Sequence, residues 1–378
     1  MRYYLIAGEA SGDLHGANLM RALKKADPSA EFRFWGGDAM AEVAGHEPAR
    51  HIRDLAIMGF VEVVMHLRTV LGNIAFCKND IADYCPRVIV GIDYPGFNLK
   101  IEKWARQHGF LVIHYISPNL WAWKKGRIKG MRRTLDRLCY ILPFEQEFYA
   151  QNNFPQAVYV GHPLLDAIHN QQFSPNDQHT IALLPGSRRQ ELKKVLPSML
   201  RLADRHLEYN FVIAGMSLIG DNFYQKLIAR YRQSHPDGAA NVRIVYDQTY
   251  PLLSQSHAAV VCSGTATLET ALFNVPQVVC YKANPISIAI ARQLVGKRIR
   301  YISLVNLILD APVVTELIQQ DLSDERLEEE FRRITDDATR KPMLESYARL
   351  RTLLGNAGAS DRTAREILNV ISQPYPQP

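Results

Sequence analysis

Short apolar runs alternate with longer amphipathic stretches along this chain. In the first half, the apolar runs predict strands at 3–7, 32–35, 88–92, 112–116 and 138–142, and the stretches between them predict helices, for example at 14–26 and 99–108. The second half repeats this rhythm, with strands expected at 181–184, 210–214, 242–245, 259–262 and 277–281. Strands that alternate with helices are typical of parallel α/β layers.

The chain has 378 residues, which is more than one hydrophobic core usually accommodates. A polar stretch at 170–178, which contains a proline, is typical of a linker. We therefore expect an α/β protein with two Rossmann-like domains, 1–168 and 169–340, that face a cleft. The remaining segment, 341–378, is helical as far as about 372 in this interpretation, and we expect it to pack back on the first domain.

The composition narrows the class of protein. Hydrophobic residues make up 47% and charged residues 22%, as in an ordinary soluble protein. The five cysteines form no CxxC pair, so we expect no disulfide framework and place Cys262 and Cys280 inside buried strands. The sequence has no zinc-ligand spacing and no Asp-x-Asp after a strand, so we expect neither a metal nor a cofactor. It also has no signal-peptide layout and no apolar run of membrane-spanning length.

Two turns in the second half have the features of phosphate sites. Each follows an apolar run and precedes a helical pattern, so unpaired backbone N–H groups and the positive end of a helix dipole would attract an anion. Arg188 adds a planar fork that suits phosphate oxygens, although a surface arginine at a helix start is the plain alternative. The turns contain Gly186, Ser187 and Arg188 in one case, and Ser263, Gly264, Thr265 and Thr267 in the other. Together they indicate a diphosphate nucleotide, as in a nucleotide-sugar transferase.

Three further residues are weaker candidates for the nucleotide. Glu269 lies within the first turns of the second helical pattern, where it would bind ribose hydroxyls or simply complement the helix dipole. Asn306 follows a strand-like run at 301–305. Glu316 is expected one helical turn before Gln319.

In the first half, acidic residues follow two strands. Glu9 comes directly after the first strand and could accept a hydrogen bond from a sugar hydroxyl, while Ser11 and Asp13, which flank Gly12, are good N-cap residues for the next helix. Asp93 follows the apolar run at 88–92, where it either caps a turn or acts as a general base. A carboxylate accepts a hydroxyl proton only late, once the forming bond has made the hydroxyl acidic. We favour the base.

The stretch 55–71 is apolar around most of a helical circumference, which indicates either a helix buried on several sides or a surface for acyl chains or the membrane interface. Between 124 and 137, seven Lys or Arg residues stand against one Asp, so this patch could contact a membrane, a phosphorylated substrate or nucleic acid. Nothing else resembles a nucleic-acid-binding module, and we expect no nucleic acid partner. The expected acyl or membrane contacts are Met58, Phe60, Val64, Leu67, Trp121 and Trp123.

Six motifs, in order and over nearly the whole chain, resemble those of the lipid-A-disaccharide synthase family. They are AGEASGD (7–13), MGFVEV (58–63), GIDYPGFN (91–98), ISPNLWAW (116–123), LPGSR (184–188) and SGTATLE (263–269). The resemblance implies an inverting glycosyltransferase of the two-domain GT-B fold. Such an enzyme joins a UDP-2,3-diacylglucosamine donor to a 2,3-diacylglucosamine 1-phosphate acceptor through a β-1,6 bond, releases UDP and needs no metal.

The resemblance also implies roles for individual residues, a cellular location and an oligomeric state. Asp93 matches the family's proposed base, and Glu9, Ser11, Gly12 and Asp13 match its acceptor-side turn. The family works on the cytosolic face of the inner membrane of Gram-negative bacteria, as a homodimer that exchanges C-terminal segments. The nucleotide pocket would contain Gly186, Ser187, Arg188, Ser263, Gly264, Thr265, Glu269 and Asn306.

Two alternatives remain from the sequence. One is an enzyme like UDP-N-acetylglucosamine 2-epimerase on the same fold, which would act on a water-soluble substrate and need no acyl surface. The other is a non-catalytic relative that binds lipid or nucleotide. Transfer assays with acylated and unacylated donors distinguish these functions.

Overall fold

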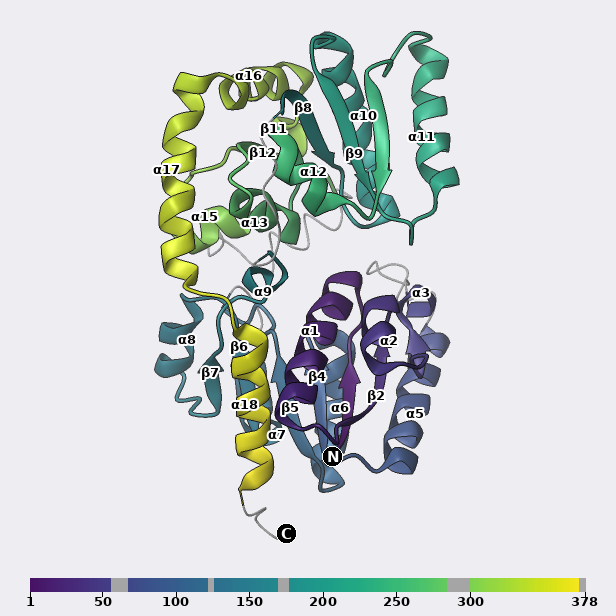
Figure 1. The fold of residues 1–378 in the computed structure, drawn as a ribbon, viewed down its shortest axis with the longest axis vertical. Coiled ribbons are helices and arrows are strands. Elements are labelled where there is room, and N and C mark those ends of the chain that lie inside the picture. Colours follow the sequence, from purple (N-terminus) through teal and green to yellow (C-terminus); the bar gives the residue numbers. More distant parts are fainter. Residues whose placement is uncertain (56–66, 122–125, 169–176, 284–299, 374–378) are drawn as a thin grey trace. The chain divides into compact units, whose positions relative to one another are not determined.

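The computed structural model describes residues 1–378 except 56–66, 122–125, 169–176, 284–299 and 374–378 (Figure 1). The chain divides into two units, each built around its own parallel sheet. Unit 1 comprises Met1–His169 and Leu354–Pro378, and unit 2 comprises Asn170–Leu353. Helices cover both faces of each sheet, as the alternating pattern predicts.

Unit 1 has a seven-stranded sheet in the order β3-β2-β1-β4-β5-β6-β7. Every described residue of β4 is buried, because helices shield both faces of its Val-Ile-Val-Gly-Ile run. The strands are β1 (Arg2–Ile6), β2 (Glu31–Gly36), β3 (Arg50–His51), β4 (Val88–Ile92), β5 (Leu111–Tyr115), β6 (Arg137–Tyr140) and β7 (Ala157–Tyr159). The helices are α1 (Ala10–Ala26), α2 (Asp38–Ala44), α3 (Ile52–Leu55), α5 (Leu67–Tyr84), α6 (Pro95–Gln107), α7 (Arg127–Thr134), α8 (Glu145–Gln151), α9 (Leu164–Ile168) and α18 (Ala359–Ser372).

Unit 2 has a six-stranded sheet in the order β10-β9-β8-β11-β12-β13. Its core lies on β8, β9 and β11 and on the inner faces of α10, α11 and α16. The strands are β8 (Asp177–Leu184), β9 (Asn210–Gly215), β10 (Val242–Tyr246), β11 (Ser256–Cys262), β12 (Gln277–Tyr281) and β13 (Glu316–Ile318). The helices are α10 (Arg189–Arg205), α11 (Asp221–Ser234), α12 (Thr249–Gln255), α13 (Thr265–Leu272), α15 (Leu304–Leu309), the short 3-10 helix η2 (Gln319–Asp321), α16 (Asp324–Thr335) and α17 (Asp337–Leu354).

The C-terminal segment divides between the two units. The expected boundary at 341 falls inside α17, which packs within unit 2: Gln277 donates a hydrogen bond of 3.2 Å to the Tyr347 hydroxyl, and Arg351 donates one of 2.7 Å to the Leu272 carbonyl. After α17, Gly355 and Gly358 have left-handed backbones, which interrupt the expected helical stretch. Only α18 returns to unit 1, where it packs against α1, β5 and β6 (Figure 1).

The run at 301–305, expected to be strand-like, is not a strand. Helix α15 begins at Leu304, because the Ser303 hydroxyl accepts the Asn306 backbone N–H at 3.2 Å and caps the helix. The expected helical spacing of Glu316 and Gln319 is also wrong, since Glu316 opens strand β13. Both errors concern short elements, in which periodicity gives little signal. Cys262 and Cys280 are buried and free, as expected.

Candidate functional site

In unit 1, the turns that follow β1 and β4 lie side by side at the carboxyl edge of the sheet. Parallel strands end at the same edge, and β1 is paired directly with β4. The Tyr94 ring lies against Gly8, so close that a side chain on Gly8 would meet it at 2.5 Å. Burial, followed by the negative charge of Glu9, raises the pKa of Tyr94. The two predicted acidic turns, with Glu9 and Asp93, are therefore neighbours.

The Asp93 turn has an unusual backbone that one buried amide holds in place. Asp93 and Tyr94 both have left-handed conformations, with φ of 47° and 50°. The Asn98 amide is fully buried and donates to the Asp93 carbonyl at 2.7 Å and to the Ile6 carbonyl at 3.2 Å. The Asp93 backbone N–H donates to Tyr115 on β5 at 2.8 Å. Asn98 thus joins the ends of β1 and β4 and fixes the half-buried Asp93 above them.

The expected caps of α1 are wrong. The N-cap position belongs to Glu9, and Ser11 and Asp13 lie inside the helix. The Asp13 carboxylate is buried and instead accepts backbone N–H groups at the start of α2, from Gly37 at 2.7 Å and Met40 at 3.1 Å. Asp13 therefore joins α1 to α2, a contact between residues 24 or more positions apart that periodicity does not reveal.

A second buried acid, Glu145, holds the segment that follows strand β6 in unit 1. Glu145 begins α8, and its carboxyl accepts the Leu142 backbone N–H at 3.2 Å. Burial raises the pKa of Glu145 to about 8. The Ser117 hydroxyl, at the start of the ISPNLWAW motif, bonds the Tyr149 hydroxyl on the same helix. The motif is thus anchored on α8 by polar groups that the sequence did not single out.

In unit 2, a carboxylate of the same chain occupies the first predicted phosphate turn. Glu191 accepts the backbone N–H groups of Ser187 at 3.1 Å and Arg188 at 3.3 Å. Gly186 has a φ of 112°, and a side chain there would meet the Glu191 Cβ at 2.8 Å, so the turn requires glycine. Arg188, about half exposed, pairs with Glu191 at 3.4 Å. The turn therefore holds an anionic group, in the capping-box arrangement that an acid at the third helical position signals.

The second predicted phosphate turn joins β11 to α13. The Ser263 backbone N–H donates to Cys280 on β12 at 3.0 Å, and its hydroxyl donates to the Ile302 carbonyl at 3.1 Å. The buried Thr267 hydroxyl donates to the Gly264 carbonyl at 2.9 Å. Gly264 is exposed, and Thr265 begins the helix.

Glu269 has a partner that the sequence reasoning missed. Its half-buried carboxylate accepts the Tyr250 hydroxyl at 3.0 Å, and desolvation raises the pKa of Glu269. Tyr250 lies on α12, 19 residues earlier, and has no periodic relation to Glu269. The hydrogen bond from Tyr250 fixes the position of one carboxylate oxygen of Glu269.

The polar groups of Asn306 and Glu316 hold a loop together. Asn306 is buried, donates to Glu316 at 2.9 Å and accepts the Val314 backbone N–H at 2.9 Å. Glu316 accepts the backbone N–H groups of Ile302 and Ser303, each at 2.9 Å. Since the Ile302 carbonyl also accepts the Ser263 hydroxyl, this loop supports the second predicted phosphate turn.

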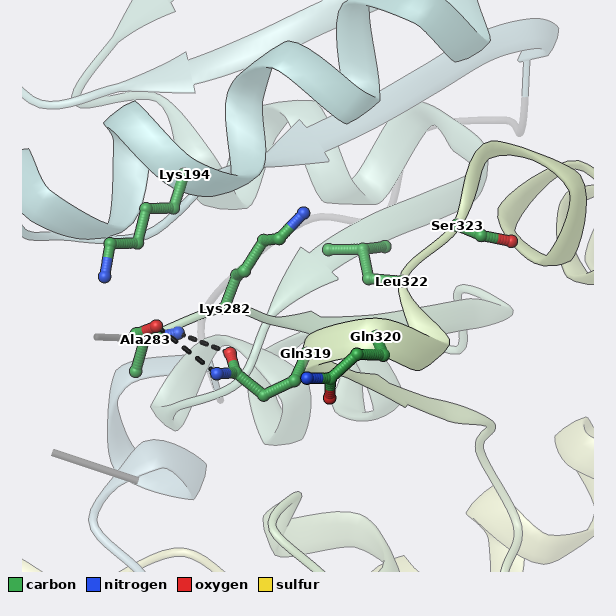
Figure 2. A pocket seen from close by; sticks show the side chains of 7 residues that line it. All are labelled: Lys194, Lys282, Ala283, Gln319, Gln320, Leu322 and Ser323. Carbon is green, nitrogen blue, oxygen red and sulfur yellow. Dashed lines mark hydrogen bonds between the residues drawn. The ribbon is translucent and has the colours of Figure 1, made fainter. Parts of the chain in front are cut away.

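A cavity of about 590 Å³ opens at the ends of β12 and β13 in unit 2 (Figure 2). The Gln319 amide closes one wall, because it accepts the Ala283 backbone N–H at 2.8 Å and donates to the Ala283 carbonyl at 3.4 Å. Lys194 and Lys282 line the cavity, so it has a cationic character.

The expected acyl and membrane contacts lie mostly outside the described residues: Met58, Phe60, Val64 and Trp123 belong to the omitted ranges, as does the side chain of Leu67. Trp121 is half-buried and packs edge-on against Phe144, with ring centroids 5.0 Å apart. On α7, the side chains of Lys129, Arg132 and Arg133 are exposed.

Within the described ranges, none of the helices combines the length and hydrophobicity that crossing a membrane requires. In the same part of the chain, no group of three or more His, Cys, Asp or Glu side chains is arranged to hold a metal ion.

Comparisons with known proteins agree over nearly the whole chain. The family model described as lipid-A-disaccharide synthetase matches residues 3–367. A lipid-A-disaccharide synthase of Geobacter sulfurreducens is 34% identical, over 98% of both chains. One from Syntrophus aciditrophicus is 36% identical, over 98% of this chain and 97% of the relative.

Solved structures share the fold at low identity. A UDP-GlcNAc 2-epimerase of Neisseria meningitidis, bound to UDP-GlcNAc, has a TM-score of 0.66 and 14% identity, over 98% of this chain and 100% of that one. The calicheamicin glycosyltransferase has a TM-score of 0.56 and 14% identity, over 100% of both chains. The two Rossmann-like units are thus those of GT-B glycosyltransferases and related epimerases.

Proposed function

This chain belongs to the lipid-A-disaccharide synthetase family, and we propose that it is the inverting glycosyltransferase that joins UDP-2,3-diacylglucosamine to 2,3-diacylglucosamine 1-phosphate. The observation that carries the proposal is the match to lipid-A-disaccharide synthases at 34–36% identity over 98% of the chain. The epimerase alternative is not favoured, because the epimerase named above is only 14% identical and supports the fold alone.

In the proposed reaction, Asp93 is the general base. The acceptor's 6-hydroxyl attacks the anomeric carbon of the donor, the new C–O bond forms as the bond to the diphosphate breaks, and Asp93 accepts the hydroxyl proton. UDP leaves with the electron pair, and the configuration inverts. The fixed position of the Asp93 turn supports this role, since a general base has to lie within hydrogen-bond reach of the proton it removes.

The donor's diphosphate is assigned to the turns that contain Gly186, Ser187 and Arg188, and Ser263, Gly264, Thr265 and Thr267. Support comes from the backbone N–H groups of 187 and 188, which donate to the Glu191 carboxylate and would donate to a phosphate in the same way. Fixed donors at a departing diphosphate contribute on the order of 3 kcal/mol each to the transition state. Glu269, with one oxygen held by Tyr250, is assigned to the ribose, and Asn306 and Glu316 support the adjoining loop.

The same proposal covers the acceptor site, the association with the membrane and the oligomeric state. Glu9 is assigned to the acceptor sugar, with Ser11, Gly12 and Asp13 shaping its turn. The exposed cations of α7 would favour an anionic bilayer surface, where both acylated substrates reside. We propose a peripheral enzyme at the cytosolic face of the inner membrane that works as a homodimer.

The proposal is tested by a sugar-transfer assay with acylated donor and acceptor, carried out with the wild type and with Asp93→Asn. We expect the variant to lose turnover by about a hundredfold or more and to bind UDP with unchanged affinity in calorimetry. The control is Asp83→Asn, which changes an exposed acid on α5. A wild type that transfers no sugar, or transfers an unacylated one equally well, contradicts the proposed reaction, and an active Asp93→Asn variant contradicts the assigned base.

A further inference from the structure

A buried histidine–glutamate pair lies beneath the Asp93 turn in unit 1. His114 on β5 and Glu102 on α6 are 0% and 1% exposed, and the His114 Nδ1 is 2.6 Å from a Glu102 carboxylate oxygen. Gly91 makes the room, because a side chain there would meet that oxygen at 2.2 Å. A charged pair taken out of water carries a desolvation cost that its mutual attraction does not always repay. Its position therefore calls for a reason besides stability.

The pair is linked to Asp93 through two elements. On the sheet, Gly91 is in register with His114 and Ile92 with Tyr115, and the backbone N–H of Asp93 bonds the Tyr115 carbonyl at 2.8 Å. On α6, Asn98 holds the Asp93 carbonyl at 2.7 Å, one turn before Glu102. The same strand and helix thus position both the candidate base and the buried pair.

The charges of the three groups are coupled. Burial lowers the pKa of His114, but the Glu102 carboxylate from α6, then Asp93 from the β4 turn and a backbone hydrogen bond at Ile116, together outweigh burial and raise it. Coupling of this kind is reciprocal: a negative Asp93 that favours a protonated His114 is itself favoured by the positive imidazolium.

We propose that Glu102 and His114 form a positioning pair whose imidazolium holds Asp93 in its ionised, proton-accepting form. The proposal rests on the assignment of Asp93 as the base. Glu102 keeps His114 charged and oriented, and His114 in turn provides a fixed positive charge below the carboxylate that has to accept the acceptor's proton. The pair does not contact the substrate; it acts through Asp93.

The first test is the pH profile of kcat/KM for His114→Asn and Glu102→Gln. The asparagine retains a donor toward Glu102 without a positive charge, and the glutamine removes the carboxylate that keeps His114 protonated. In both variants, we expect the acid limb to move upward by about 0.5–1 pH unit, which is a three- to tenfold loss of rate on that limb, with little loss on the alkaline plateau. His108→Asn, at the exposed end of the same helix, should leave the profile unchanged.

The second test does not disturb the pair. In ¹⁵N-labelled protein, the His114 ring should titrate at a lower pH in Asp93→Asn than in the wild type, because one of the two carboxylates is gone. If the titration stays the same, or if folded His114→Asn retains the wild-type acid limb, the pair is structural only and the inference is overturned. A chain that transfers no sugar at all contradicts the proposed function instead, while the titration still reports on the coupling.

Discussion

The carboxyl edges of the two sheets are built in different ways. In unit 1, the strand ends rest on buried ionisable side chains, as with the His114–Glu102 pair and Glu145. In unit 2, half-buried acids accept backbone N–H groups, Glu191 at the turn after β8 and Glu316 at the start of α15, as the buried Glu145 and Asp13 also do in unit 1.

The difference shows how one architecture serves two tasks. Buried ionisable groups shift the protonation state of a neighbour, because a low-dielectric environment strengthens the interaction between charges. Backbone amides at helix starts bind anions without a change of protonation. Under the proposed function, unit 1 would handle the proton and unit 2 would hold the leaving diphosphate.

The substitution with the largest expected effect is at Asn98, at the carboxyl edge of the unit 1 sheet. In Asn98→Asp, a carboxylate replaces the amide that donates to the carbonyls of Ile6 and Asp93. We expect unit 1 to lose about 3 kcal/mol of stability, because a buried acceptor then faces other acceptors. Hydrogen exchange should accelerate in β1 and β4 but not in β8 and β11. Asn222→Asp, exposed on α11, is the control, and equal protection in both variants would mean that Asn98 does not hold the turn.

A smaller effect is the pH dependence of stability, which we expect to differ between the two sheet edges. The pKa of Glu145 is raised by burial to about 8 in the folded protein, against an ordinary value of 4.5. The stabilising contribution of the neutral form is therefore complete below pH 4.5 and is lost as the pH rises toward 8. Glu145→Gln should remove about 2 kcal/mol of this dependence between about pH 5.5 and 7.5, measured by hydrogen exchange in β6.

Two comparisons make the Glu145 test decisive. Glu147→Gln changes an exposed acid on the same helix and should leave the pH dependence intact. Strands of unit 2 should keep their wild-type pH response in Glu145→Gln. A flat pH dependence in wild-type β6 would show that Glu145 ionises normally, and the contrast between the edges would weaken.

The smallest effect concerns the Glu191 carboxylate in the first phosphate turn. Glu191→Gln removes a negative charge from the start of α10 and should destabilise unit 2 by about 1 kcal/mol. If the diphosphate uses the same amides, UDP should bind a few-fold more tightly, because its competitor has lost its charge. Calorimetry measures the affinity, with Glu329→Gln on α16 as the control. Unchanged UDP affinity would leave Glu191 as a cap and place the diphosphate elsewhere.

Much of this molecule could be read from local patterns. The strand runs and the helices between them were visible because apolar periodicity reports burial within one element. The turns with Gly186 and Asp93 were also located, since each directly follows a strong strand. Short strands such as β3 and β13 were not predicted, because two or three residues are too few to show a hydrophobic periodicity.

The hydrogen-bond partners of the candidate site residues are set by tertiary contacts and not by local patterns. The sequence gives no sign that Asn98 reaches Ile6, 92 residues away, or that Tyr250 bonds Glu269. The first contact depends on the strand order, which places β1 beside β4, and the second on the packing of α12 and α13, which lie on either side of β11 in the chain.

The sequence by itself determined the parallel α/β architecture, the family and the strand ends at which chemistry was to be sought. Only the tertiary structure decided that Asp13 joins two helices, that Glu191 caps the turn predicted to bind phosphate and that a buried histidine–glutamate pair lies below Asp93. The physical reason is range: hydrophobic patterning acts within an element, whereas hydrogen bonds and buried charges act between elements that the chain brings together only when it folds.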